Sequence, residues 1–201
     1  MLKALVYTLE LLAVGLLIYI IILPFYPSLK YKIEYDNAEI KKEAQNLNKA
    51  KETLQSYKNN FPGADYSVSP NRLIIGKIGV NAPIVESKNS DYGLSKGSWL
   101  VPDTSTPDKG GNTVITGHRF KYLPPNNLTF YLLDKLEKDD IISVIWQEKN
   151  YYYQVMKTKI VAADDLSILK PTASSTLTLY TCDPIYSTKN RLVVIAELLD
   201  K

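Results

Sequence analysis

The feature that most restricts the fold is a series of short β-branched and aromatic runs in residues 65–201. Turn-forming segments such as PDKGGN, LPPNN and DPIYSTKN separate these runs, and only residues 130–137 (FYLLDKLE) show a helical pattern. Many short strands at this spacing are typical of a β-sandwich or a β-barrel. A barrel has the advantage of leaving few open strand edges. The sequence therefore predicts a mainly β domain over residues 65–201.

The N-terminal segment has a different character. Residues 4–23 form a run of twenty residues in which Glu10 is the only charge, and a helix of that length matches the hydrocarbon thickness of a bilayer. A cleaved signal peptide is the alternative, but the following PFYPS lacks the small residues of a cleavage site. We expect residues 1–27 to be a single-pass transmembrane anchor in the cell membrane. The C-terminal domain is expected to be extracellular, because long folded domains are generally translocated despite nearby lysines.

Residues 28–64 are polar and connect these two parts. Ile40, Leu47 and Leu54 recur every seven residues within a segment that lacks Pro and Gly between residues 33 and 58. This spacing predicts a short amphipathic helix, which would serve as a stalk or as a brief dimerising coiled coil. The turn-forming NNFPGAD at residues 59–65 then ends the linker.

Composition excludes several classes of function. The 24 basic and 21 acidic residues are nearly balanced, with a net charge of +3, whereas a nucleic-acid-binding domain has a concentrated basic face. One cysteine and one histidine cannot supply the four ligands of a structural zinc site. We expect no metal site, no cofactor and no nucleic-acid partner.

Three rare residues lie at the ends of predicted strands, beside turns. They are the only cysteine, Cys182, the only histidine, His118, and Arg191, which is one of three arginines. Strand alternation places Cys182 on the more polar face of its run. If the runs around Cys182 and Arg191 pair as a hairpin, both residues reach one rim of the domain. Each residue alone is more often structural, but their agreement favours a functional site.

The chemistry of these groups suggests one reaction. A thiol with an ordinary pKa of about 8.5 is mostly protonated at neutral pH and needs an activating neighbour. An imidazole can pair with the thiolate and then protonate a leaving amine, while an arginine can stabilise an oxyanion. Together they are suited to acyl transfer through a thioester.

The same residues resemble the signatures of the sortase family. TGH at 116–118, TLYTC at 178–182 and Arg191 are similar to the family's His, TLxTC and Arg motifs. The resemblance continues through LIIGKIGVNAPIV, FYLLDKLEKDDIISV and RLVVIAELL, and covers roughly residues 72–199. It implies a closed eight-stranded sortase-type β-barrel with short helices.

The resemblance also implies a membrane-bound cysteine transpeptidase that cuts an LPXTG-like sorting signal of secreted proteins after its Thr. Cys182 would form the thioacyl intermediate, His118 would act as general acid and base, and Arg191 would position the substrate and stabilise its oxyanion. Thr181 would assist substrate or oxyanion binding. The acyl acceptor would be an amine of a peptidoglycan precursor or of a pilin, and calcium dependence is left open.

Some features depart from the family pattern. Gly76 replaces an expected Pro, Lys138-Asp139 replaces a Gly-Asp turn, and neither a second span nor an Asp-Pro-aromatic lid is apparent. Because pilus-building members commonly carry the second span and the lid, the last two features favour a housekeeping-like or class D/E-like enzyme. Two alternatives remain. One is a membrane-anchored cysteine peptidase that releases its product to water, although papain-like enzymes place Cys before His. The other is a non-catalytic surface adaptor.

Overall fold

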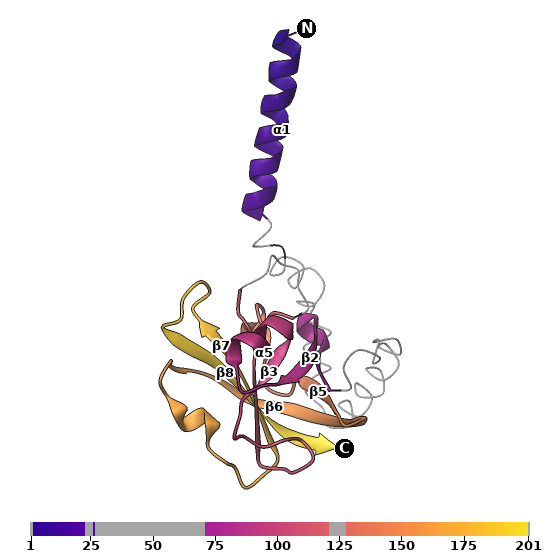
Figure 1. Ribbon diagram of the computed structural model, residues 1–201, viewed down its shortest axis with the longest axis vertical. Coiled ribbons are helices and arrows are strands. Elements are labelled where there is room, and N and C mark those ends of the chain that lie inside the picture. The colour runs from indigo at the N-terminus through magenta and orange to yellow at the C-terminus, as the bar shows by residue number, and fades with distance from the viewer. Residues whose placement is uncertain (1, 23–25, 27–70, 121–127, 201) are drawn as a thin grey trace.

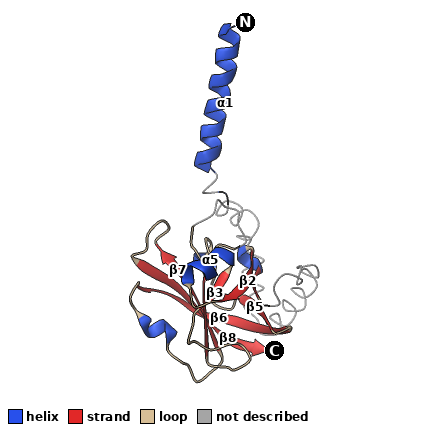
Figure 2. Ribbon diagram, in the orientation of Figure 1, coloured by secondary structure: helices blue, strands red, loops and turns tan. Residues whose placement is uncertain are grey.

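The domain is a closed β-barrel, as the resemblance implied. The computed structural model describes residues 2–22, 26, 71–120 and 128–200. Eight strands pair around the barrel in the order β1-β2-β3-β4-β7-β8-β6-β5, and β5 closes it by pairing with β1. Figures 1 and 2 show this barrel below the N-terminal helix α1. The stalk predicted within residues 28–64 lies outside the described residues.

The strands follow the runs read from the sequence, with one addition, the short β3. Their bounds are β1 Arg72–Ile75, β2 Val80–Glu86, β3 Ser98–Leu100, β4 Asn112–Thr116, β5 Ile141–Trp146, β6 Lys149–Ala162, β7 Thr176–Asp183 and β8 Asn190–Asp200.

The face alternation predicted for the last two strands is confirmed. Leu177 and Leu179 of β7 are fully buried, as are Val194 and Ala196 of β8, and all four belong to the main hydrophobic core. Cys182 lies on the opposite face of β7 and is only partly buried. The inward apolar positions therefore leave the polar positions of the same strands for a site on the barrel wall.

The short helices differ from the prediction. The segment at 130–137 contains only the 3-10 turn η3 (Leu133–Lys135), while the helix α5 (Ser90–Lys96) was not predicted. Asn89 caps α5 by accepting a hydrogen bond from the Tyr92 backbone N–H at 2.9 Å, which is the usual role of Asn at a helix N-terminus. Two further 3-10 turns are η2 (Gly76–Ile78) and η4 (Leu166–Leu169).

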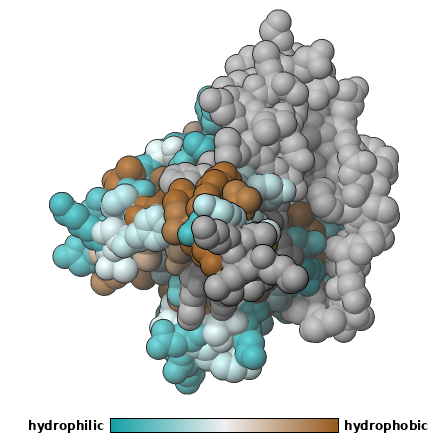
Figure 3. All heavy atoms as spheres, turned by 90° about the horizontal axis from the view of Figure 1, so that it is seen from above, coloured by the Kyte–Doolittle hydropathy of each residue, from teal (hydrophilic) through white to brown (hydrophobic). Residues whose placement is uncertain are grey.

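The N-terminal helix α1 spans Leu2–Ile22 and exposes apolar side chains, with Leu11 at 73% and Leu12 at 70%. Figure 3 looks down on the molecule and shows brown hydrophobic spheres near the centre of the view. In the part of the chain that the structure describes, no helix meets the length and hydropathy required to cross a membrane. The transmembrane anchor over residues 1–27 therefore stays a prediction.

Asn112, at the start of β4, fixes a loop far away in the chain. Its amide nitrogen donates to the carbonyl oxygens of Ile168 and Lys170 at 2.9 Å each, and its Oδ1 accepts from Thr178 Oγ1 at 2.7 Å. Asn112 is 4% exposed. Without this amide, its partner groups would lose a hydrogen bond in a place that water does not reach. The contacts of Asn112 therefore stabilise the arrangement. Asn112 thus holds η4 against β4 and β7.

We expect Asn112→Ala to lower the free energy of unfolding by about 3 kcal/mol, since it leaves buried polar groups without partners. Lys170→Ala is the matched control, because Lys170 receives the bond on its backbone oxygen and its side chain is exposed. Denaturant unfolding monitored by circular dichroism measures both variants. Equal stability of the two would contradict the role given to Asn112.

Candidate active site

The pairing of three strands brings the predicted site residues to one edge of the barrel. β4 runs parallel to β7, with Thr116 opposite Tyr180, so the segment that continues to His118 ends beside the end of β7. β8 runs antiparallel to β7, and Cys182 is the register partner of Arg191. Parallel neighbours end at the same edge, and an antiparallel neighbour begins there. His118, Cys182 and Arg191 therefore meet at this edge, although 64 residues separate His118 from Cys182.

The three residues line one cavity of about 220 Å³. Thr116, Gly117 and Tyr180 also line it, and Asp165 adds a carboxylate. The rest of the wall is largely apolar and comes from α5, β3 and η4, through Leu94, Trp99, Leu166, Ile168 and Leu169. A mostly apolar pocket with a few convergent polar groups is the usual form of a small-ligand or peptide-binding site.

The backbone around His118 is held by several contacts. The His118 carbonyl accepts a hydrogen bond from the Phe130 N–H at 2.8 Å, and the Thr116 hydroxyl donates to the Tyr180 carbonyl at 2.8 Å. A Cβ added at Gly117 would lie 2.9 Å from two carbons of the Phe130 ring. Glycine is therefore required here for the close approach of the ring, and the imidazole is presented from a closely packed segment.

Thr181, which was predicted to assist substrate or oxyanion binding, lies on the buried face of β7. Its side chain is 1% exposed and does not line the cavity, and its hydroxyl donates to the Gly117 carbonyl at 2.7 Å. Since Thr181 alternates with Cys182, its side chain points toward the opposite face of β7. This hydrogen bond joins the strand that carries Cys182 to the residue before His118.

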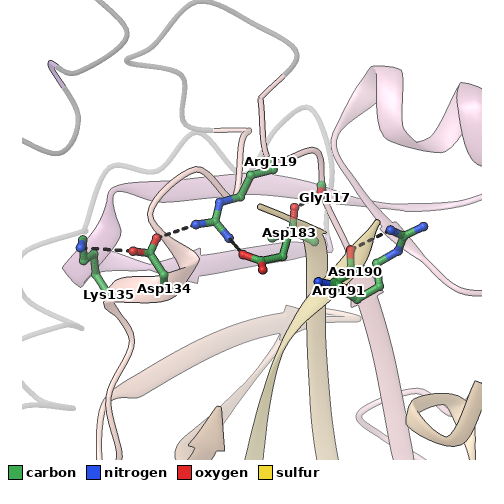
Figure 4. A network of polar contacts seen from close by, with 8 residues as sticks. Gly117, Arg119, Asp134, Lys135, Asp183, Asn190 and Arg191 are labelled. Atoms are coloured by element: carbon green, nitrogen blue, oxygen red, sulfur yellow. Dashed lines mark hydrogen bonds and ion pairs between the residues drawn. The ribbon is translucent and has the colours of Figure 1, made fainter. Parts of the chain in front are cut away.

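Arg191 is positioned by the loop between β7 and β8. Its Nη1 donates to the carbonyl oxygens of Thr188 and Asn190, both at 2.9 Å, and Figure 4 shows the contact with Asn190. A guanidinium carries five N–H donors, so these two bonds leave the Nε and Nη2 hydrogens for other acceptors. Arg191 can thus be oriented by the protein and still bind a substrate carbonyl or an oxyanion.

Tyr180 is a member of the cavity that the motif comparison did not single out. Burial raises the pKa of the Tyr180 phenol, and this effect outweighs the hydrogen bond with Thr116 and the positive charge of Arg191, which act in the opposite direction. The phenol is therefore neutral at physiological pH and keeps its proton for donation. Its position two residues before Cys182, on the same face of β7, was the available sequence signal.

The remaining residues of the cavity wall were harder to predict from the sequence. Trp99 is set by a hydrogen bond from its indole Nε1 to the Ser87 carbonyl at 2.7 Å, and η4 reaches the cavity through the Asn112 contacts. Both depend on tertiary packing between segments far apart in the sequence, so periodicity along the chain did not reveal them.

Comparison with known proteins identifies the class of this barrel. The family model of the sortase domain matches residues 73–199, which is more than half of the chain. The chain therefore belongs to the sortase family.

Individual relatives agree with this assignment. Sortase D of Bacillus subtilis is 36% identical over 97 residues, which cover 48% of this chain and 45% of that protein, so the chain matches about half the length of this relative. The structure of Group B Streptococcus Pilus Island 1 Sortase C2 is similar with a TM-score of 0.58 at 32% identity, covering 65% of this chain and 73% of that one. The structure of a Clostridium perfringens Sortase D5 transpeptidase is similar with a TM-score of 0.57 at 25% identity, and the match covers 81% of this chain and 94% of that one.

We expect Gly117→Ala to lower the free energy of unfolding by about 2 kcal/mol, because the new methyl group overpacks the segment against Phe130. It should also slow alkylation of Cys182 by iodoacetamide, since His118 shifts with its neighbour. Gly15→Ala is the control, because an added Cβ there meets nothing within 4 Å. Thermal unfolding and mass spectrometry of the alkylated chain measure the two effects. Unchanged stability and alkylation in Gly117→Ala would refute the close packing.

Proposed function

We propose that this protein is a cysteine transpeptidase that cleaves an LPXTG-like sorting signal and transfers the acyl group to an amine. The observation that carries the proposal is that Cys182, His118 and Arg191 line one cavity in a sortase-family barrel. The cavity also has an apolar wall suited to the leucine and proline of such a signal. The chemistry needs no cofactor.

In the first step, the Cys182 thiolate attacks the carbonyl carbon of the signal's Thr and forms a tetrahedral intermediate. Collapse of this intermediate forms the thioester and breaks the peptide bond, and the His118 imidazolium gives its proton to the departing amine. In the second step, an acceptor amine attacks the thioester after His118 removes its proton. The new amide bond forms as Cys182 leaves as a thiolate.

Arg191 would stabilise the oxyanion of both tetrahedral intermediates. The hydrogen bonds of its Nη1 to two backbone carbonyls support this role, because a donor that is already held in place needs little reorganisation during the reaction. Backbone N–H groups near Cys182 would share this work. Thr181 would contribute indirectly, by holding the Gly117 segment, rather than by contacting the substrate.

The partners follow from the same proposal. Secreted proteins with a sorting signal would be the acyl donors, and a peptidoglycan precursor or a pilin would supply the amine. The apolar side chains exposed on α1 and the uncharged run from residue 11 to residue 23 support a single-pass membrane anchor with the barrel outside the cell. Among the sortase classes, the identity to Sortase D favours a class D-like enzyme.

The experiment uses the full chain in detergent micelles with quenched-fluorophore peptides that carry LPXTG-like signals. With an amine acceptor such as triglycine, we expect cleavage, a ligated product and a Cys182-linked acyl adduct detected by mass spectrometry. Cys182→Ala should remove all three, because no other residue of the chain carries a thiol. Absence of cleavage and of the adduct across a varied peptide panel would refute the proposal.

Variants of the other two residues separate their roles. His118→Ala should lower kcat/KM by about 10³-fold through loss of the general acid, and Arg191→Ala by about 10²-fold through loss of an oxyanion donor. Arg191→Lys should recover only part of that loss, because an ammonium lacks the planar fork that contacts the loop. Product released to water at the same rate with and without the amine would instead support a hydrolase. A function retained in Cys182→Ala would support an adaptor.

A further inference from the structure

Arg119 occupies an unusual position beside the active site. It directly follows His118, is 5% exposed and pairs with two carboxylates. Its Nη2 donates to Asp134 Oδ1 at 2.9 Å, and its Nη1 lies 3.7 Å from Oδ1 of Asp183, the residue that directly follows Cys182. Figure 4 shows the guanidinium between these carboxylates. The ion pair therefore joins the residue after His118 to the residue after Cys182.

A second contact joins the same two segments. The ring of Phe120, the next residue after Arg119, meets the ring of Tyr186 edge-on, with centroids 4.7 Å apart. Tyr186 belongs to the loop between β7 and β8, whose carbonyl groups also orient Arg191. Phe120 packs in turn against Tyr131, with centroids 5.9 Å apart. Edge-to-face contacts of this kind favour one relative orientation of the rings.

We propose that Arg119, Asp183, Phe120 and Tyr186 form a clasp that holds the imidazole of His118 in register with the sulfur of Cys182. Arg119 and Asp183 are its positioning residues. The strand pairing of β4 with β7 ends at Thr116 and Tyr180, and the Gly117 contacts with the Tyr180 carbonyl and the Thr181 hydroxyl extend it by one residue. The clasp closes the gap beyond that point, where small displacements change the distance between the reacting groups.

The buried setting of Arg119 supports a positioning role. Burying a cation away from water is costly unless the cation is paired. The two carboxylates offset that cost for Arg119 and restrict where its guanidinium can lie. An exposed ion pair would be loose and weak. The planar guanidinium can contact both carboxylates at once, which ties η3, the His118 segment and the end of β7 together.

The clasp deepens the proposed function and rests on it, but it can be tested without a peptide substrate. Alkylation by iodoacetamide at neutral pH requires the thiolate, and a cation held next to a sulfur favours that form, so the rate at Cys182 would report how well His118 is held. In the full chain, we expect Asp183→Asn and Arg119→Gln each to slow alkylation about tenfold, toward the rate of His118→Ala, because an ångström of displacement is enough for losses of this size.

Asp183→Asn distinguishes positioning from simple charge. If Asp183 acted only through its negative charge near the sulfur, its removal would favour the thiolate and speed alkylation. If it positions His118 through Arg119, its removal slows alkylation. In the double variant the two losses should not add, because either substitution opens the same contact. Alkylation of Asp183→Asn at or above the wild-type rate overturns the clasp, and so does a His118→Ala variant that is alkylated as fast as the wild type.

Two controls address folding and specificity. Lys135→Gln removes the far end of the same polar network, the Nζ of Lys135 that lies 3.2 Å from Asp134 Oδ2, and should leave alkylation unchanged. Tyr186→Phe keeps the ring and should match the wild type, whereas Tyr186→Ala should slow alkylation. All variants are compared by circular dichroism and at temperatures well below their Tm. A loss in Asp183→Asn that is fully accounted for by unfolded chain overturns the proposal.

Peptide cleavage provides the second readout. Asp183→Asn should lower kcat with KM within twofold, because the apolar wall that binds the signal is untouched. If the wild-type chain cleaves no peptide but its alkylation depends on both His118 and Asp183, the proposed function fails and the clasp stands. If the wild-type chain cleaves peptides and Asp183→Asn does so equally well, the clasp fails and the function stands.

Discussion

The pairing of β7 with β4 on one side and with β8 on the other is the constraint on which the site depends. The first pair is parallel and the second antiparallel, so one edge of the sheet receives the end of β4, the end of β7 and the beginning of β8. His118, Cys182 and Arg191 occupy these three positions. Their proximity is a consequence of strand direction and register, and a shift of β7 by one residue would turn Cys182 into the core.

Strand pairing sets the backbone, and a small number of buried polar contacts set the positions just beyond it. The Thr181 hydroxyl joins the end of β7 to Gly117, and the Asn112 amide joins η4 to the start of β4. Such contacts are worth most where water is excluded, because the alternative is an unsatisfied polar group. The first holds Gly117 and the second holds Ile168, and both of these residues line the cavity. The barrel therefore presents the cysteine and the histidine next to a wall made of the short elements α5, β3 and η4.

The sequence predicted the parts of the molecule that follow local rules. Alternation along β7 identified Cys182 as lying on the outward face, and the rarity of cysteine and histidine pointed to the site. The short elements α5 and β3 were not predicted, since Ser90–Lys96 is too short for a clear helical period and Ser98–Leu100 is stabilised by its neighbours rather than by its own residues. Their side chains, including Trp99, form the apolar wall. The wall thus depends on packing between distant segments, which spacing along one chain does not encode.

The use of arginine in this chain shows how composition can carry structural information. Lysine supplies nearly all of the positive charge, and arginine occurs only at positions 72, 119 and 191. Each of the three contacts at least two acceptor atoms: Arg72 binds the side chain and the carbonyl of Asn81, Arg119 pairs with two carboxylates, and Arg191 binds two backbone carbonyls. A planar fork with several fixed donors meets this requirement, whereas an ammonium acts as a compact point charge. When a chain has a general preference for lysine, its few arginines mark the places where the direction of a cation matters. Arg191 lines the cavity together with Cys182 and His118, and Arg119 directly follows His118, which is the physical reason why a scarce guanidinium indicated the site before any distance was known.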